Sequence, residues 1–173
     1  TMTRQPTTFV TVVFEGDELM LRLQARSIAR HAGALTDTRI IVIENFRSPR
    51  SPAWRKRQRA LYGAFAPNVR FVAADDLTGT IRAEGWWKQQ LLKLAVVRLV
   101  DTDTYLVLDG KTLLIRDLRP EDLFAADGRP KMAISGYAAH PLEWFFDQAM
   151  AYFNLDRADW IGRFVETAPP FTV

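Results

Sequence analysis

Three consecutive residues in the middle of the chain, Asp109, Gly110 and Lys111, combine a carboxylate, a flexible backbone position and an ammonium group. They stand between two apolar runs, residues 105–108 and 112–115, where a charged pair has no packing role. Glycine allows a sharp turn or the close approach of a ligand. A carboxylate and an ammonium at this spacing can hold a diphosphate, the lysine directly and the aspartate through a hydroxyl or a metal ion. The same spacing also fits a hairpin turn with a solvated aspartate and lysine.

The elements around this tripeptide follow an alternating pattern. Short β-branched and aromatic runs of strand length occur at residues 9–14, 40–43, 69–73 and 105–108. Helical patterns lie between them, at residues 17–33, 53–65 and 86–100. This order predicts an α/β fold with a mostly parallel sheet flanked by helices. A further strand is expected at residues 131–135 and an aromatic-rich helix at residues 143–153.

Ligands of such sheets bind beyond the carboxyl ends of the strands, which selects the polar residues that follow each apolar run. Asp17 comes after the first run, where it also suits a helix N-cap, the role that we favour. Glu44 follows the second run, and Asp109 follows the run at residues 105–108, which we expect to form the central strand. The helix at residues 86–100 leaves little polar face, so we expect it to be mostly buried.

The net charge of the chain is +3, but its basic residues are unevenly placed. Residues 47–59 contain no acidic residue and six basic ones, Arg47, Arg50, Arg55, Lys56, Arg57 and Arg59. The stretch fits an electrostatic footprint for phosphate or for peripheral contact with an anionic membrane. It also fits a solvated helix after a proline-containing loop, which we favour. We expect no nucleic-acid partner.

Composition and missing motifs exclude several function classes. The chain has no cysteine, which rules out disulfides and thiolate catalysis and is typical of a reducing compartment. Residues 1–6 are polar and contain no signal-peptide core, so we expect a cytoplasmic protein. The sequence contains no Walker A loop, no G-x-G-x-x-G after a strand and no G-x-S-x-G elbow. These absences count against a P-loop NTPase, a Rossmann dehydrogenase and a standard α/β-hydrolase.

The stretch at residues 86–118, WWKQQLLKLAVVRLVDTDTYLVLDGKTLLIRDL, resembles the centre of GT-A glycosyltransferase domains. In those domains a helix leads into an apolar strand that ends in Asp-x-Asp and is followed by a second apolar strand. The stretch is most similar to an uncharacterised bacterial family of glycosyltransferase-like proteins with a Trp-x-Lys-Gln-Gln-type helix. The resemblance covers most of residues 9–153, and its specific part is this central segment.

The resemblance implies a nucleoside-diphosphate sugar as donor and a diphosphate site at Asp109, Gly110 and Lys111. In the superfamily, both aspartates of the motif hold Mg²⁺ or Mn²⁺ against the diphosphate. Here Lys111 stands in place of the second aspartate, which leaves Asp109 as the one candidate metal ligand beside a repelling charge. We therefore expect no resident metal. The tripeptide Asp101-Thr102-Asp103 spells the motif, but it precedes the strand and reads as a polar connection at the opposite end of the sheet.

Other residues gain roles by their position in the resemblance. Glu44 could hold the ribose or base, or be a solvated loop carboxylate, and Asp17 could contact the nucleotide. Lys88 and Gln89 begin a helix, so they are ligands if this turn faces the cleft and surface residues if it does not. The adjacent pair at positions 86 and 87, both tryptophan, could stack on a sugar or base, although packing under the sheet is favoured. His140 lies in a loop that borders the donor sugar and acceptor in the superfamily, or it is structural.

The leading expectation is therefore a glycosyltransferase that moves a sugar from a nucleoside diphosphate to an acceptor hydroxyl. The sequence identifies no catalytic base. We expect one GT-A-like domain over residues 1–173, ending earlier than the resembled domains, so that part of the acceptor side is absent or supplied by another chain. The alternatives are a non-catalytic member that binds a nucleotide sugar or polysaccharide, and a module that binds phosphate-rich surfaces through its basic stretch.

Overall fold

The computed structural model describes residues 6–79, 82–131, 133–136, 143–161 and 165–168. The chain divides into two compact units, Thr1–Pro120 (unit 1) and Glu121–Val173 (unit 2). The single domain expected over residues 1–173 stays a prediction. None of the helices in the described ranges has the length and apolar character needed to cross a bilayer.

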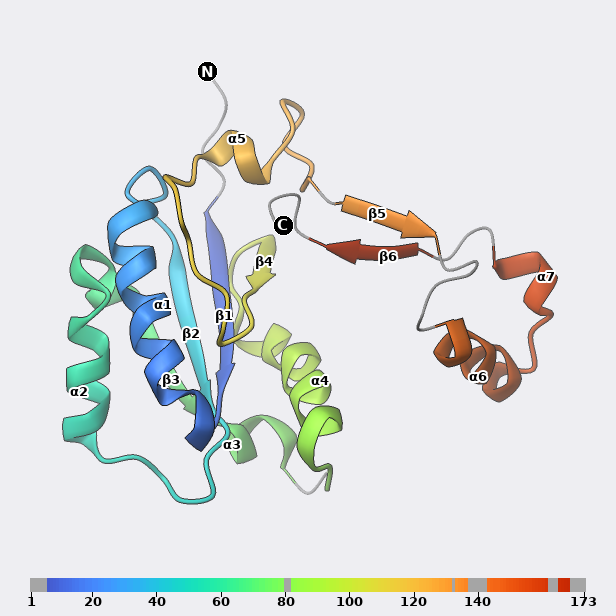
Figure 1. The fold of residues 1–173 in the computed structure, drawn as a ribbon, viewed down its shortest axis with the longest axis horizontal. Coiled ribbons are helices and arrows are strands. Elements are labelled where there is room, and N and C mark those ends of the chain that lie inside the picture. Colours follow the sequence, from blue (N-terminus) through green and yellow to red (C-terminus); the bar gives the residue numbers. More distant parts are fainter. Residues whose placement is uncertain (1–5, 80–81, 132, 137–142, 162–164, 169–173) are drawn as a thin grey trace. The chain divides into compact units, whose positions relative to one another are not determined.

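Unit 1 is built on a four-stranded sheet with the strand order β3-β2-β1-β4 (Figure 1). The strands are β1 (Thr7–Val13), β2 (Arg39–Glu44), β3 (Val69–Ala73) and β4 (Thr104–Val107), and all three pairings are parallel. Every residue of β1 is buried, as expected for an inner strand that is covered on both faces. The parallel α/β architecture that the sequence predicts is confirmed.

Helices cover both faces of this sheet (Figure 1). The helices α1 (Glu18–His31) and α2 (Pro52–Ala60) lie on one face, and α3 (Ala74–Thr78) and α4 (Gly85–Ala95) lie on the other. Three 3-10 turns adjoin them: η1 (Glu15–Asp17), η2 (Gly63–Asn68) and η3 (Val96–Leu99). The short helix α5 (Pro120–Leu123) follows β4 along the chain. Because the strands are parallel, all of them begin at one end of the sheet, which we call the amino edge. All of them finish at the opposite end, the carboxyl edge, so the residues that follow the strands gather there.

The core between the sheet and α4 is a continuous apolar cluster. Val10, Ile41 and Val72 contribute to it from the sheet, and Leu92 and Val96 contribute from α4 and η3. On the opposite face, α1 buries the predicted apolar stripe of Leu21, Ala25 and Ile28. The packing of α4 and α1 on the two faces of the sheet holds the carboxyl edge in place, and the candidate site lies at that edge.

Among its described residues, unit 2 contains most of α5, a two-stranded antiparallel sheet and two further helices. Its strands are β5 (Ala133–Gly136) and β6 (Val165–Ala168), and the two further helices are α6 (Glu143–Phe153) and α7 (Arg157–Trp160). The bounds of α6 match the sequence prediction, and Phe146 and Met150 are its buried residues. The strand β6 was not predicted, because its pairing partner lies about 30 residues earlier and its own sequence has no strong alternation.

The helix predicted over residues 86–100 differs from the structure in length and burial. It ends as an α-helix at Ala95 and continues as the 3-10 turn η3. The side chain of Leu94 is 69% exposed and that of Val97 is 56% exposed, so the expectation of a mostly buried helix was wrong. One side of α4 packs on the sheet through Leu92 and Ala95, and within the described part of unit 1 no further layer covers Leu94 and Val97.

Three further expectations about unit 1 need correction. The helix expected over residues 53–65 ends at Ala60, because Gly63 takes a positive φ of 56° and Pro67 follows. The apolar run at residues 112–115 forms no strand, since the backbone N–H of Leu114 donates to Ser27 Oγ on α1. The strand β4, expected to be central, lies at the edge of the described sheet.

Candidate functional site

A cleft of about 830 Å³ opens at the carboxyl edge of the sheet in unit 1. The exits of β1, β2 and β3 and the first turn of α4 provide its walls. Its polar lining includes Glu15, Asn45, Arg47, Arg82, Lys88 and Gln89. The sequence left open whether Lys88 and Gln89 face a cleft, and the structure places both in its wall. Their contact with a ligand stays a prediction.

Charges of both signs line the cleft, and its acidic residues are Glu15, Asp75 and the exposed Glu84. The Asp75 carboxylate pairs with Lys88, with 3.2 Å between Oδ1 and Nζ. The Glu15 carboxylate accepts the backbone N–H of Arg47 at 2.6 Å. This hydrogen bond is the main reason that the pKa of Glu15 is lowered, with smaller contributions from the charges of Arg50 and Arg47. The guanidinium groups of Arg47 and Arg82 form no ion pair with any described residue, so they remain available to an anion.

The Asp109-Gly110-Lys111 turn follows β4 at the same edge of the sheet. Asp109 Oδ1 lies 2.8 Å from the Nζ atom of Lys93 on α4, and the aspartate side chain is 71% exposed. Lys111 is exposed and pairs with no acidic group in the part of the chain that the structure describes. Lys93 was not identified from the sequence, although its position one helical turn after Gln89 places both on one face of α4.

The side chain of Asp17 lies beside this turn. It occupies the N-cap position of α1, as the sequence predicts, but its side chain makes no capping hydrogen bond there. A Cβ atom added to Gly110 would lie 3.5 Å from Asp17 Oδ2 and 3.6 Å from the carbonyl oxygen of Val12. The exits of the neighbouring strands β1 and β4 therefore bring Asp17 and the Asp109 turn together.

A buried glutamine of α1 holds the backbone of the turn in place. Gln24 is 1% exposed, and its Nε2 donates to the carbonyl oxygens of Asp109 and Thr112 at 2.8 and 3.0 Å. Its Oε1 accepts the hydroxyl of Thr11 on β1 at 2.8 Å. Sequence reasoning missed Gln24. The available signal was a polar residue within the apolar stripe of α1, which requires buried partners.

The carboxylate of Glu44 forms an ion pair with Arg55 of α2. Both of its carboxylate oxygens accept hydrogen bonds at 2.7 Å from the Arg55 guanidinium, and the Glu44 side chain is 2% exposed. The hydrogen bond to Glu44 is the main reason that the pKa of Arg55 is raised. Glu44 is the last residue of β2 and is not among the residues that line the cleft, whereas the next residue, Asn45, does line it. A ribose-binding role for Glu44 stays a prediction, and Asn45 is the better placed neighbour.

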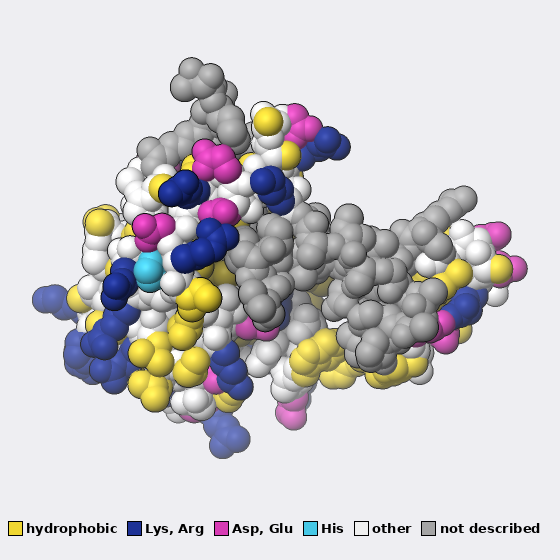
Figure 2. Space-filling model, turned by 45° about the horizontal axis from the view of Figure 1, so that its top comes forward, with side chains coloured by type: hydrophobic (Ala, Val, Ile, Leu, Met, Phe, Trp, Pro, Cys, Tyr) yellow, Lys and Arg dark blue, Asp and Glu magenta, His cyan; other side chains and the backbone are white. Residues whose placement is uncertain are grey.

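The side chains of three of the six basic residues at positions 47–59 form ion pairs or hydrogen bonds with other residues of the protein. Arg50 pairs with Glu18 and lies over the ring of Phe46, while Arg55 pairs with Glu44. Arg59 donates to the carbonyl oxygen of Val69. Figure 2 shows basic side chains spread over the side of unit 1 that carries α1 and α2, with acidic and apolar side chains between them. The stretch therefore does not form a continuous basic surface for phosphate, and it is also more than a helix whose charges are only solvated.

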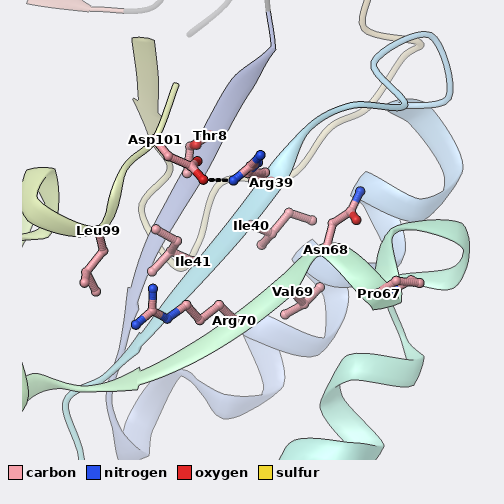
Figure 3. Close-up of a pocket in the computed structure, with 10 residues that line it drawn as sticks. All are labelled: Thr8, Arg39, Ile40, Ile41, Pro67, Asn68, Val69, Arg70, Leu99 and Asp101. Atoms are coloured by element: carbon pink, nitrogen blue, oxygen red, sulfur yellow. Dashed lines mark ion pairs between the residues drawn. The ribbon is translucent and has the colours of Figure 1, made fainter. Parts of the chain in front are cut away.

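The opposite edge of the sheet carries Asp101-Thr102-Asp103 (Figure 3). Asp101 forms an ion pair with Arg39, the first residue of β2, and Thr102 Oγ1 lies 2.8 Å from Thr8 Oγ1. These residues adjoin a cavity of about 350 Å³ that Arg39, Arg70 and Asp101 help to line. The structure confirms that this Asp-x-Asp sequence lies at the amino edge, away from the strand exits.

The residues around Asp109 do not fit a divalent cation. Asp109 is paired with Lys93, Lys111 follows within two residues, and Asp17 is the one other carboxylate near Gly110 among the described residues. Within those same ranges, no group of three or more His, Asp or Glu side chains is placed to hold a metal ion. Hard cations require several oxygen ligands. His140 lies outside the described residues.

Comparisons with known proteins give a family and similar solved structures. No curated protein matches the chain. A similar solved structure is that of the bifunctional glycosyltransferase WbbM in its apo form, at 20% sequence identity and a TM-score of 0.46. The match covers 68% of this chain and 21% of that one, so the chain spans about a fifth of the length of WbbM. The profile of the family of unknown function DUF6492 matches residues 17–167, and the chain belongs to that family.

Proposed function

We propose that this chain binds a nucleoside-diphosphate sugar at the carboxyl edge of its sheet and transfers the sugar to an acceptor hydroxyl. The observation that carries the proposal is the cleft of about 830 Å³ at the strand exits, with Arg47, Arg82 and Lys88 in its walls. Ligands of parallel α/β sheets bind at this edge, and the volume lies within the range of small-molecule sites, roughly 300–1,000 Å³. Guanidinium and ammonium groups are the side chains that bind phosphate most strongly.

The reaction breaks the bond between the anomeric carbon of the sugar and the diphosphate oxygen. A new bond forms from the acceptor oxygen to that carbon, the acceptor proton passes to a base, and the nucleoside diphosphate leaves with the bonding electrons. Stabilising the charge that develops on the leaving group is the main electrostatic task. Lys88 and Lys111 are the ammonium groups proposed for it, and Gln89 and Asn45 supply neutral hydrogen-bonding groups in the cleft wall. The described residues do not identify the base.

Metal independence is part of the proposal. With Lys93 on Asp109 and Lys111 two residues away, the turn presents cations where a metal-dependent enzyme would present carboxylates. Two ammonium groups can neutralise a diphosphate, although each is a weaker electrostatic partner than a divalent ion. Binding of the donor is therefore expected to persist in EDTA.

The experiment is a calorimetric titration of UDP-, GDP- and other nucleoside-diphosphate sugars into the protein, with EDTA and with Mn²⁺. Binding of one donor in both conditions, lost in Lys88→Ala and kept in Arg57→Ala, is the expected result. Arg57 is a matched control because it is basic, exposed and on the outside of α2. Binding without release of nucleoside diphosphate in the presence of acceptors would support the non-catalytic alternative. Failure of every donor to bind would refute the proposal.

The alternative of a phosphate-surface module is less well supported. Arg50 and Arg55, which the module would need, are paired with Glu18 and Glu44. The exposed basic residues of α2 are Lys56 and Arg57. Two cations are too few to bind a phosphate-rich surface strongly.

A further inference from the structure

Two adjacent tryptophans begin α4 with large parts of their side chains in solvent. Trp86 is 52% exposed and Trp87 is 62% exposed. Their rings meet edge to face, with 4.8 Å between the ring centroids and 75° between the ring planes. The expectation that they pack under the sheet was wrong. Exposed tryptophan is uncommon, and such residues are enriched in binding sites because they offer a large rigid apolar surface.

The two tryptophans differ in their relation to the cleft. Trp86 lines it together with Lys88 and Gln89, whereas Trp87 does not. Trp86 and Lys88 both lie in the first turn of α4, within one helical pitch of about 5.4 Å. The cleft wall therefore places an aromatic plane next to the ammonium of Lys88, which a phosphate would share with the exposed Asp75 carboxylate or take from it.

This combination matches the two chemically distinct parts of a nucleotide. A nucleobase is planar and aromatic and stacks on tryptophan, while the diphosphate pairs with cations. Stacking of this kind tolerates different bases, because every base has a π face. An acceptor sugar would offer no second anionic group to account for the neighbouring lysine and arginines.

We propose that Trp86 forms the nucleobase subsite of the cleft, stacking on the base while Lys88 holds the diphosphate. This inference rests on the proposed function and specifies which part of the donor occupies which wall. It assigns the exposed first turn of α4 to recognition of the donor. Trp87 is a neighbour that supports the ring of Trp86 edge to face.

The test compares a nucleotide with a ligand that lacks the base. UDP, GDP and inorganic pyrophosphate are titrated into wild type, Trp86→Ala, Trp86→Phe and Trp87→Ala. Trp86→Ala is expected to weaken nucleotide binding by about 5- to 100-fold, the range measured for loss of one base-stacking side chain. Pyrophosphate binding should change less than twofold, and Trp86→Phe should restore most of the nucleotide affinity. Trp87→Ala is the matched control and should have a smaller effect than Trp86→Ala.

Intrinsic fluorescence gives a second readout of the same contact. Nucleotide should quench the emission of wild type and of Trp87→Phe, and the quenching should be lost in Trp86→Phe. Equal nucleotide affinity in Trp86→Ala and wild type would overturn this inference while leaving the proposed function intact. Equal losses for nucleotide and pyrophosphate would also overturn it, by making Trp86 a structural support. Absence of both nucleotide and pyrophosphate binding in wild type would overturn the two proposals together.

Discussion

Two aspartate-containing tripeptides flank β4 and have opposite structural roles. Asp101-Thr102-Asp103 precedes the strand, and its first two residues are tied to Arg39 and Thr8 at the amino edge of the sheet. Asp109-Gly110-Lys111 follows the strand, and its charged side chains are exposed at the carboxyl edge while Gln24 holds its backbone. The tripeptide that spells the metal-binding motif is thus structural. The one that departs from it lies at the carboxyl edge, although its residues are not among those that line the cleft. Strand direction, rather than similarity to a motif, decides which of them is available to a ligand.

The largest expected effect comes from removing the residue that fixes the second tripeptide. Gln24→Leu leaves the Thr11 hydroxyl and two carbonyl oxygens of the turn without their buried partner. We expect a loss of about 2–4 kcal/mol in the free energy of unfolding, measured by urea denaturation. Arg26→Ala, an exposed position two residues further along α1, is the control and should change stability by less than about 0.5 kcal/mol. A Gln24→Leu variant as stable as wild type would mean that the turn is held by other contacts.

Lys111→Ala tests whether the tripeptide after β4 contributes to binding of the donor. It removes an exposed ammonium and should leave stability unchanged, but it should weaken donor binding by about 1.5–3 kcal/mol, the range for a hydrogen bond to a charged group. Lys111→Asp should create a metal requirement rather than abolish binding. Titration of the donor with EDTA and with Mn²⁺ measures both. Unchanged affinity in Lys111→Ala would make Lys111 a solvated turn residue.

Asp101→Asn should give the opposite pattern. It removes the ion pair with Arg39, and because both side chains are more than half exposed, we expect a loss of only about 0.2–1 kcal/mol in stability. Donor binding should be unchanged, because Asp101 lies at the other edge of the sheet. Calorimetry and thermal unfolding of the same preparation measure the two quantities. A drop in donor affinity would contradict the structural role assigned to this tripeptide.

The smallest expected effect is the pH dependence contributed by Glu15 at the cleft rim. The hydrogen bond from Arg47 lowers the pKa of Glu15 below its ordinary value of 4.5. A carboxyl group whose pKa is lower in the folded state adds stability above its unfolded pKa and loses that contribution as the pH falls through the folded pKa. The difference in Tm between wild type and Glu15→Gln should therefore be constant above about pH 6 and shrink below pH 4.5. A difference that is independent of pH would mean that the hydrogen bond does not require the charge.

The sheet was predictable because each of its strands is a short apolar run bounded by polar residues. Residues 9–14 and 69–73, for example, match β1 and β3 closely. Periodicity could not show which side of α4 meets the sheet, because its apolar residues Leu91, Leu92 and Leu94 lie on several sides of the helix. Which residues are buried there depends on the number of layers, a tertiary property.

The sequence predicted at which edge of the sheet the candidate site lies, but it did not predict which side chains contact one another there. The rule of strand exits selected Asp109 and Glu44, but the carboxylate of Glu44 is paired with Arg55, 11 residues away. Lys88 and Gln89 were selected from their place in the first turn of a helix, and both line the cleft. Lys93 and Gln24 were missed, because their roles arise from pairings between distant segments such as α1 with the turn after β4. Local sequence spacing does not carry that information.

The most direct test of the carboxyl-edge site is a map of backbone amide chemical shifts during titration with the donor nucleotide in EDTA, at a chain mass of 19.8 kDa that suits the method. The account predicts saturable shifts at Asn45, Lys88 and Gln89 and in the Asp109 turn. Residues at the amino edge, such as Arg70 and Thr102, should not move. Shifts confined to the cavity at the amino edge, or shifts that arise only when Mn²⁺ is added, would contradict it.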